Sequence, residues 1–167
     1  MKNINISYYN KCGVNYRLGS YDEKLCLLES IHSKNRVKTK NRLQKGLDAD
    51  YVESEDAVLK QTAKELNEYF EGKRKNFDVP LVMVGSEFQK SVWEALLKIP
   101  YSETSTYKDQ AKSIGNEKAV RAVANANGAN AISIIIPCHR IIGSDGSLTG
   151  YAGGLELKQR LLEIEKN

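Results

Sequence analysis

Residues 134–142 read Ile-Ile-Ile-Pro-Cys-His-Arg-Ile-Ile and place a thiol, an imidazole and a guanidinium between two apolar segments. The isoleucines predict a strand. Pro137 cannot donate a ladder hydrogen bond, so the strand is expected to stop at Cys138. A cysteine reacts as a thiolate, and a neighbouring His or Arg lowers the pKa of its thiol. Of the three cysteines, Cys138 alone has an adjacent His or Arg, which indicates a nucleophile.

A structural role for Cys138 is the alternative. Cysteine is among the most buried residue types, and a cysteine in an isoleucine-rich strand is usually inert core. Burial of Arg140 without a partner would be costly, however, so the triplet fits a core poorly. The run alone leaves both interpretations open.

Length and composition limit the class of protein. The chain has 167 residues, 41% of them hydrophobic, enough for one domain or two small ones with a real core. No apolar run approaches membrane-spanning length, and the N-terminus has no basic region followed by an apolar stretch. We expect a soluble cytoplasmic protein without a membrane partner, associated with the nucleoid if the source is prokaryotic. An odd number of cysteines without a CxxC pair argues against a disulfide framework.

The net charge of +4 is weak evidence for a nucleic-acid partner. The densest basic stretch, residues 34–45, has six Lys or Arg and no acid, and the acidic stretch 48–56 follows it. A solvated loop or helix face accounts for both more simply than a phosphate-binding track. If DNA is the partner, the evidence has to come from a local structural motif and not from the net charge.

Residues 1–83 predict an α/β N-terminal support domain. Alternating or apolar segments bounded by turn residues predict strands over residues 4–8, 14–18 and 25–28. Apolar side chains at helical spacing predict a helix over 57–70 that ends at Gly72. The polar stretch 73–80 predicts a connection, which sets the domain boundary near residue 83.

Residues 84–167 predict a mainly α C-terminal domain. Ser86 to Gln89 is a capping box that opens a helix ending before Pro100. Thr106 to Asp109 is a second box, which opens a short helix that stops at Gly115. Two short helices separated by a Gly-containing turn indicate a helix-turn-helix.

The remainder of this half predicts a wing. Asn116 is expected to cap the third helix, which runs to about Asn127. Residues 143–146 predict a hairpin-like turn after the strand expected around Cys138, and residues 155–165 predict a terminal helix. Helices followed by a strand pair indicate a winged helix-turn-helix.

The third helix has a single Arg among small side chains on its outer face. Ala119, Val120 and Val123 are expected to face inward, and Lys118, Arg121, Ala122 and Asn125 outward. Such a face suits close approach to a narrow groove, where Arg121 could probe or replace a base. An ordinary surface helix, rich in Ala for its propensity, is the alternative.

Several motifs with matching spacing carry a family resemblance. They are FQKSVWEAL at 88–96, Tyr107, RAV at 121–123, Asn130, IPCHR at 136–140 and GYAGG at 150–154. Together they resemble the O6-alkylguanine-DNA alkyltransferases, or methylated-DNA–protein-cysteine methyltransferases. The resemblance covers about residues 84–165, and the pentad around the cysteine is highly specific. Residues 1–80 match only in general character; in the family this half has an RNase H-like sheet.

The resemblance implies direct-reversal DNA repair. Cys138 would irreversibly accept an alkyl group from O6-alkylguanine in double-stranded DNA, once per molecule. His139 would deprotonate it through a bound water, and Glu165 would orient and polarise His139. The position of Glu165 agrees, because it lies four residues after Leu161 on the edge of a buried face. A frayed Glu in solvent is the alternative.

The resemblance also implies binding roles. Arg121 resembles the finger that replaces the flipped guanine, with Ala122 and Asn125 on the same DNA-facing surface. Tyr107 resembles the tyrosine that rotates the phosphate and donates to the guanine ring; a core aromatic is the alternative. Asn130 resembles a hinge before the active-site strand; a turn Asn with a local backbone bond is the alternative.

The last binding expectations concern the guanine pocket. Tyr151 and Ala152 resemble the loop that walls this pocket, and Arg140 is expected among the residues that bind substrate or DNA. Many relatives have Ser where this chain has Ala152, so the hydroxyl is missing here while a backbone N–H remains. This difference bears on substrate range.

We expect no cofactor, no metal and no obligate protein partner, and therefore a monomer. Cys12, Cys26 and His32 are the candidate zinc ligands, whereas a structural tetrahedral site needs four. A non-catalytic winged-helix damage sensor or regulator is an alternative function, although sensors of this type commonly have Trp in place of Cys138. A cysteine hydrolase would also use a Cys and a His.

Overall fold

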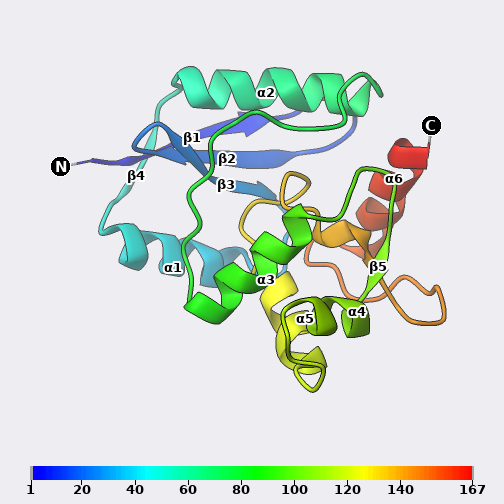
Figure 1. Ribbon diagram of the computed structural model, residues 1–167. Helices are drawn as coiled ribbons and strands as arrows, with labels where there is room; N and C mark the ends of the chain where they lie inside the picture. The colour runs from blue at the N-terminus through cyan, green and yellow to red at the C-terminus, as the bar shows by residue number, and fades with distance from the viewer. Residues whose placement is uncertain (1, 167) are drawn as a thin grey trace. The chain divides into compact units, whose positions relative to one another are not determined.

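The computed structural model describes residues 2–166, which form two compact units that divide between Gly85 and Ser86. The first unit contains a sheet with two helices, and the second is mainly helical, as the sequence predicts (Figure 1). Each unit is described here by itself. None of the helices in residues 2–166 combines the length and the apolar character of a membrane span.

A four-stranded sheet in the order β3-β2-β1-β4 is the frame of the first unit. Its strands are β1 (Ile4–Tyr9), β2 (Tyr16–Tyr21), β3 (Lys24–Ser30) and β4 (Tyr51–Glu53). The first three are antiparallel neighbours, and β4 runs parallel to β1. The three predicted strands are confirmed. Strand β4 was not predicted, because an edge strand of three residues is too short for its alternation to be recognised.

Two helices flank this sheet on opposite faces (Figure 1). Helix α2 (Ala57–Phe70) confirms the predicted helix, and Asp56 caps it by accepting the N–H of Leu59. Asn5 of β1 donates to Asp56, which ties the strand to the start of α2. Helix α1 (Arg36–Leu47) occupies the basic stretch, for which the sequence left a loop or a helix face open.

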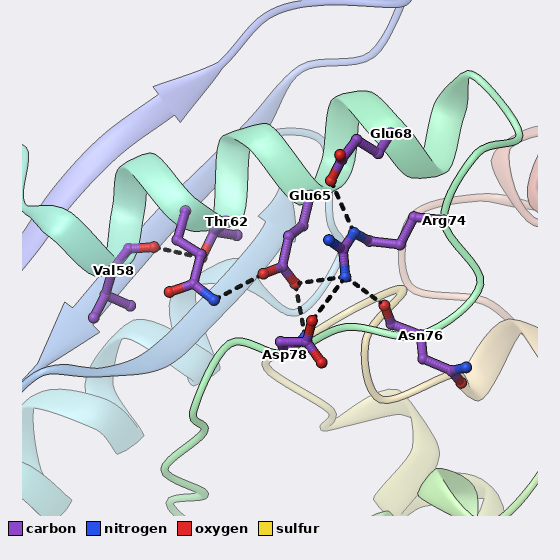
Figure 2. Close-up of polar contacts among 8 residues, drawn as sticks. Val58, Thr62, Glu65, Glu68, Arg74, Asn76 and Asp78 are labelled. Carbon is purple, nitrogen blue, oxygen red and sulfur yellow. Dashed lines mark hydrogen bonds and ion pairs between the residues drawn. The ribbon is translucent and has the colours of Figure 1, made fainter.

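Side-chain contacts hold the connection after α2 against that helix (Figure 2). Arg74 donates from Nε to Glu68 at 2.9 Å and from Nη1 to the carbonyl oxygen of Asn76 at 2.9 Å and the carboxylate of Asp78 at 3.1 Å. The buried Glu65 accepts the main-chain N–H of Asp78 at 2.8 Å. The connection therefore follows a fixed path although it has no regular secondary structure.

The second unit contains four α-helices in the described residues. They are α3 (Glu87–Leu97), α4 (Tyr107–Ser113), α5 (Val120–Gly128) and α6 (Leu155–Lys166). Both predicted caps are confirmed: Ser86 and Gln89 form a reciprocal capping box, and Thr106 accepts the N–H of Asp109. Trp93 of α3 is buried and donates from Nε1 to a carbonyl oxygen of α5 at 2.8 Å. Apolar packing and this bond place α5 against α3.

Two expectations about the third helix are wrong. Helix α5 begins at Val120, because the carbonyl of Asn116 closes a separate turn by accepting the N–H of Ala119. Val120, expected to face inward, is 37% exposed. In the first turn of a helix that starts this late, its side chain is not covered by the neighbouring helices, whereas Val123, one turn later, is buried as expected.

The expected strand before Cys138 is also wrong. The segment leading to Cys138 is a series of turns in which Ile134 has a φ of 69°, and Cys138–Arg140 is one turn of 3-10 helix. A strand starts only afterwards: β6 (Ile141–Ile142) pairs in parallel with β5 (Ser105–Thr106). The isoleucines pack in the core, and a run of buried apolar residues does not by itself require a strand.

The antiparallel strand pair expected for the wing is not found in residues 2–166. The turn expected at residues 143–146 forms, since the N–H of Gly146 donates to the carbonyl of Gly143 at 2.9 Å. No strand follows it in the part of the chain that the structure describes, and the partner of β6 is β5.

Candidate active site

His139, Arg140 and Glu165 form a buried cluster beside Cys138. His139 is 0% exposed and Glu165 is 2% exposed. The Nε2 of His139 lies 2.6 Å from Oε2 of Glu165, and Arg140 donates from Nε to Oε1 at 2.8 Å. The last turn of α6 thus supplies one carboxylate to two consecutive residues of the 3-10 turn. The structure brings together the Cys, His and Glu that the sequence singled out.

The carboxylate of Glu165 is fully used. Besides His139 and Arg140, it accepts the main-chain N–H of Ser102 at 3.3 Å. Arg140 also donates from Nη2 to Oε2 at 3.2 Å and from Nη1 to the carbonyl oxygen of Ile99 at 2.6 Å. Buried charges are stable only with such complete pairing.

This position of Arg140 corrects an expectation. We expected its guanidinium to contact substrate or DNA, but Arg140 is only 7% exposed. It donates inward to Glu165 and Ile99, and it lies 5.8 Å from the ring centroid of Tyr101. Arg140 is therefore a residue that positions Glu165, since its donors are directed into the protein.

The imidazole of His139 is neutral at ordinary pH. Burial lowers its pKa below the usual 6.5, although hydrogen bonding to Glu165 opposes this shift. A carboxylate accepts, so Nε2 carries the proton and Nδ1 carries the lone pair. Nδ1 is buried and has no hydrogen-bond partner in residues 2–166. A nitrogen with a lone pair is therefore available on the residue that follows Cys138.

The thiol of Cys138 is protonated at rest, contrary to expectation. Burial raises its pKa above the usual 9.0, while a hydrogen bond from Asn130 and the charge of Lys158 lower it in part. The neighbouring imidazole cannot stabilise a thiolate by charge, because it is itself neutral. Proton removal therefore has to accompany the reaction.

Asn130 organises the turns that lead to Cys138. The side chain is buried, and its Nδ2 donates to the carbonyl oxygen of Ile136 at 2.8 Å and to Sγ of Cys138 at 3.3 Å. Its Oδ1 accepts the N–H of Ile132 at 3.0 Å. One amide thus fixes both the loop backbone and the sulfur.

A second group of contacts meets at the carbonyl oxygen of Thr149. Tyr107, at the start of α4, donates its hydroxyl to this oxygen at 3.3 Å. Lys158 of α6 donates to the same oxygen from Nζ at 2.7 Å. Tyr151 is buried two residues further on, and Ala152 is partly exposed. Tyr107 and this loop, which the sequence assigned to one pocket, therefore lie together.

Lys158 was not predicted from the sequence. It is 0% exposed, and burial lowers the pKa of its ammonium. Lysine is almost never fully buried, so a helical Lys is assumed to face solvent. The signal was its spacing: it lies three residues before Leu161 and seven before Glu165, on the buried face of α6.

The remaining predicted residues lie on the outer face of α5. Arg121, Ala122 and Asn125 are all exposed. A reciprocal pair of buried amides, Gln110 of α4 and Asn127 of α5, joins the two helices with bonds of 2.7 and 2.8 Å. The pair was not predicted, and it fixes the angle at which α5 presents Arg121.

Candidate metal ligands are dispersed. Within residues 2–166, no three His, Cys, Asp or Glu side chains are grouped so as to hold a metal ion. Cys26 is buried in β3, and Cys12 is exposed.

Comparison with known proteins agrees with this geometry. Family models of 6-O-methylguanine DNA methyltransferase match the chain twice: the ribonuclease-like domain over residues 21–83 and the DNA binding domain over residues 87–167. The methylated-DNA–protein-cysteine methyltransferase of Methanosarcina barkeri is 52% identical over 131 residues, which cover 78% of this chain and 81% of the relative. The inducible enzyme of the same name from Bacillus subtilis is 53% identical over 112 residues, 67% of this chain and 63% of the relative.

A solved structure extends the match to the whole fold. The crystal structure of Mycobacterium tuberculosis OGT in complex with DNA has a TM-score of 0.82 at 38% identity, with 98% of this chain and 92% of the other covered. With the identity to curated relatives and the matched family models, this similarity shows that the chain belongs to the 6-O-methylguanine DNA methyltransferase family.

Proposed function

We propose that the protein repairs DNA by direct reversal. An alkyl group, methyl above all, is transferred from O6 of guanine in double-stranded DNA to Sγ of Cys138, irreversibly and once per molecule. The observation that carries this proposal is the buried pair of His139 and Glu165 beside a partly buried cysteine. The names of the curated relatives, methylated-DNA–protein-cysteine methyltransferases, support it.

The reaction is an in-line displacement. A bond forms between Sγ and the alkyl carbon while the bond from that carbon to O6 breaks, and its electron pair stays on the guanine. The thiol proton passes to Nδ1 of His139 through a water molecule, because this nitrogen has a lone pair and no protein partner in the described residues. Glu165 stabilises the imidazolium that results. The product thioether is a poor leaving group, so each molecule reacts once.

Reaching the lesion requires the nucleotide to leave the duplex, at a cost of about a few kcal/mol. Helices α4 and α5 act as the helix-turn-helix, and the exposed face of α5 with Ala122 and Asn125 lies against DNA. Arg121 fills the space left by the extruded guanine and offsets part of the cost. The M. tuberculosis relative solved in complex with DNA supports DNA as the partner.

The extruded base binds between Tyr107 and the loop containing Tyr151 and Ala152. In the free protein the Tyr107 hydroxyl donates to the carbonyl of Thr149. On binding, it exchanges this acceptor for the guanine ring and stabilises negative charge on the leaving base. The backbone N–H of Ala152 faces the guanine oxygen, without the hydroxyl that a serine would add.

The finer architecture follows the same assignment. Residues 1–83 form the RNase H-like support domain, and residues 84–167 form the domain that binds DNA and accepts the alkyl group. The segment after β6 takes the place of the wing, although β6 itself pairs with β5.

Intact-mass spectrometry after incubation with duplex DNA containing O6-methylguanine tests this function. One methyl adduct per molecule, mapped to the peptide with residue 138, is expected. Cys138→Ser is expected to bind the DNA without gaining mass, and Cys12→Ser, which changes the exposed cysteine of the first unit, is expected to react like the parent. Repeated turnover, or lesion binding by the parent without any adduct, would overturn the proposal and favour a hydrolase or a sensor.

A further inference from the structure

Helix α1 carries charge of one sign. Residues 34–47 contain six Lys or Arg and no Asp or Glu. The other helices of more than ten residues in the described part of the chain, α2, α3 and α6, each carry acids and bases together. This difference separates α1 from an ordinary solvated helix, where mixed charges are the rule.

Most of this charge faces solvent. The exposed basic residues of the helix and its entry are Lys34, Arg36, Lys38, Lys40 and Lys45, here called the α1 basic face. Thr39 and Leu43 are buried and mark the inward side of the helix. Arg42 is excluded from the face because it is partly buried and donates from Nε to the carbonyl oxygen of Val84 at 3.0 Å.

The arrangement works against the stability of the helix. Arg36 and Lys40 are like charges at i,i+4, and so are Lys38 and Arg42, a spacing at which like charges repel. The first turn has no acid, although the positive end of the helix dipole lies there. Of these cations, Lys45 in the last turn is the one that suits the dipole. This charge pattern lowers the stability of the helix, and binding of an external anion to the basic residues would account for it.

Nearby carboxylates leave the face positive. Glu29 on β3 lies near Arg36 and Arg42, but it forms an ion pair with Arg17 at 2.8 Å. Asp48 and Asp50 follow the C-terminal end of α1, and Glu53 is in β4. Asp48 and Asp50 line a pocket with Lys45, and Asp50 and Glu53 line another with Arg36 and Lys40, so these carboxylates offset part of the charge. Lys34 and Lys38 line neither pocket.

We infer that the α1 basic face binds the phosphates of duplex DNA, as a second contact outside α5. The inference rests on the proposed function, because DNA is the polyanion that this function brings to the protein. Lysine acts as a point charge on phosphate and reads no sequence, so the contact holds the protein on undamaged duplex as well as at a lesion. Each phosphate neutralised releases counterions, which makes the contact measurable through salt.

The experiment compares two variants in which the same amount of charge is removed. In the first, Lys34, Lys38, Lys40 and Lys45 are changed to Gln; in the second, Lys11, Lys24, Lys60 and Lys64, which are exposed elsewhere in the same unit, are changed to Gln. Gln and Lys have similar helix propensity, so α1 is retained. Binding of undamaged duplex is measured at several salt concentrations.

For the α1 variant, the slope of log K against log salt is expected to fall by about 0.9 for each phosphate that is no longer neutralised, hence by about two or more in all. The affinity at low salt is expected to fall by at least about tenfold. The control variant is expected to keep its slope to within about 0.5. Equal slopes in the two variants, or a larger change in the control, would overturn the inference.

Two further measurements separate this inference from the proposed function. Methyl transfer from O6-methylguanine as the free base is expected at the same rate in parent and variants, which shows that both variants fold. A double variant, Lys34→Gln with Lys38→Gln, is expected to show about half the decrease in slope of the α1 variant. If the parent gains no methyl from DNA, the proposed function fails; if it gains one but the slopes agree, only the α1 inference fails.

Discussion

The Nε2 of His139 and Oε2 of Glu165 lie 2.6 Å apart, although the two residues are separated by 26 positions and belong to a 3-10 turn and to α6. Both are buried, so this pair is one of the strong, charge-assisted contacts of the second unit. It orients the imidazole with its free nitrogen directed away from the carboxylate.

Glu165→Gln is expected to damage both stability and chemistry. The change removes the charge that balances Arg140, so the free energy of unfolding should fall by about 3–5 kcal/mol. Single-turnover transfer should slow by about 100-fold or more, since the imidazolium loses its stabilising carboxylate. Denaturant unfolding and quench-flow assays measure the two effects. Glu163→Gln, exposed on the same helix, should change stability by less than about 0.5 kcal/mol.

The buried His139 is expected to make stability depend on pH. Because its pKa is lowered in the folded state, the unfolded chain binds one more proton once the pH falls below about 6.5. The free energy of unfolding should therefore decrease by up to about 1.4 kcal/mol per pH unit below that point, before the carboxylates titrate. Denaturation at pH 7.5, 6.5 and 5.5 measures the slope. His32→Asn, which removes the exposed histidine, should keep it; loss of the slope in this variant would contradict the assignment.

Lys158→Met is expected to act through the thiol. The positive charge of Lys158 lowers the pKa of Cys138, so removing it should raise that pKa further. Transfer should slow at pH 7 and approach the parent rate only when the pH passes the pKa of the thiol, which is above the usual 9.0 in the parent and higher still in the variant. A pH–rate profile measures this. Lys166→Gln on the same helix is the control, and an equal decrease in rate at every pH would indicate a structural role instead.

Asn130→Ala is expected to loosen the loop that holds the sulfur. It removes the partner of the buried Ile132 N–H, and an unpaired buried group costs about 1–3 kcal/mol. The Ile136 carbonyl loses one of two donors and keeps the N–H of Cys138. Loss of the bond to Sγ should also move the pH–rate profile to higher pH. Asn116→Ala, on an exposed turn, should leave both thermal unfolding and the profile unchanged.

The helices could be predicted because their signals are local. The caps at Ser86 and Thr106 fix two helix starts within a few residues, and both starts are confirmed; of the two, the cap at Ser86 is the reciprocal box, formed with Gln89. The apolar segment before Cys138 was wrongly predicted as a strand, because buried strands and buried turns both contain apolar residues. Only long-range pairing with Ser105–Thr106 decides where β6 begins.

In the candidate site, too, some features could be predicted from local sequence and others could not. The inward position of Glu165 followed from its spacing to Leu161 on one helix, and the structure places it there. The raised pKa of the Cys138 thiol could not be predicted, since it depends on burial that only the folded chain creates. The same holds for the N–H of Ser102, which reaches Glu165 across 63 positions.

The dependence of the reactive centre on the last turn of α6 ties reactivity to completed folding. A molecule in which that helix has not yet docked has an imidazole without its anion and a guanidinium without its counter-ion. Such a molecule has no paired imidazole to take the thiol proton, so it cannot carry out the transfer. Completed docking of the last helical turn is therefore a condition for the single reaction of each molecule.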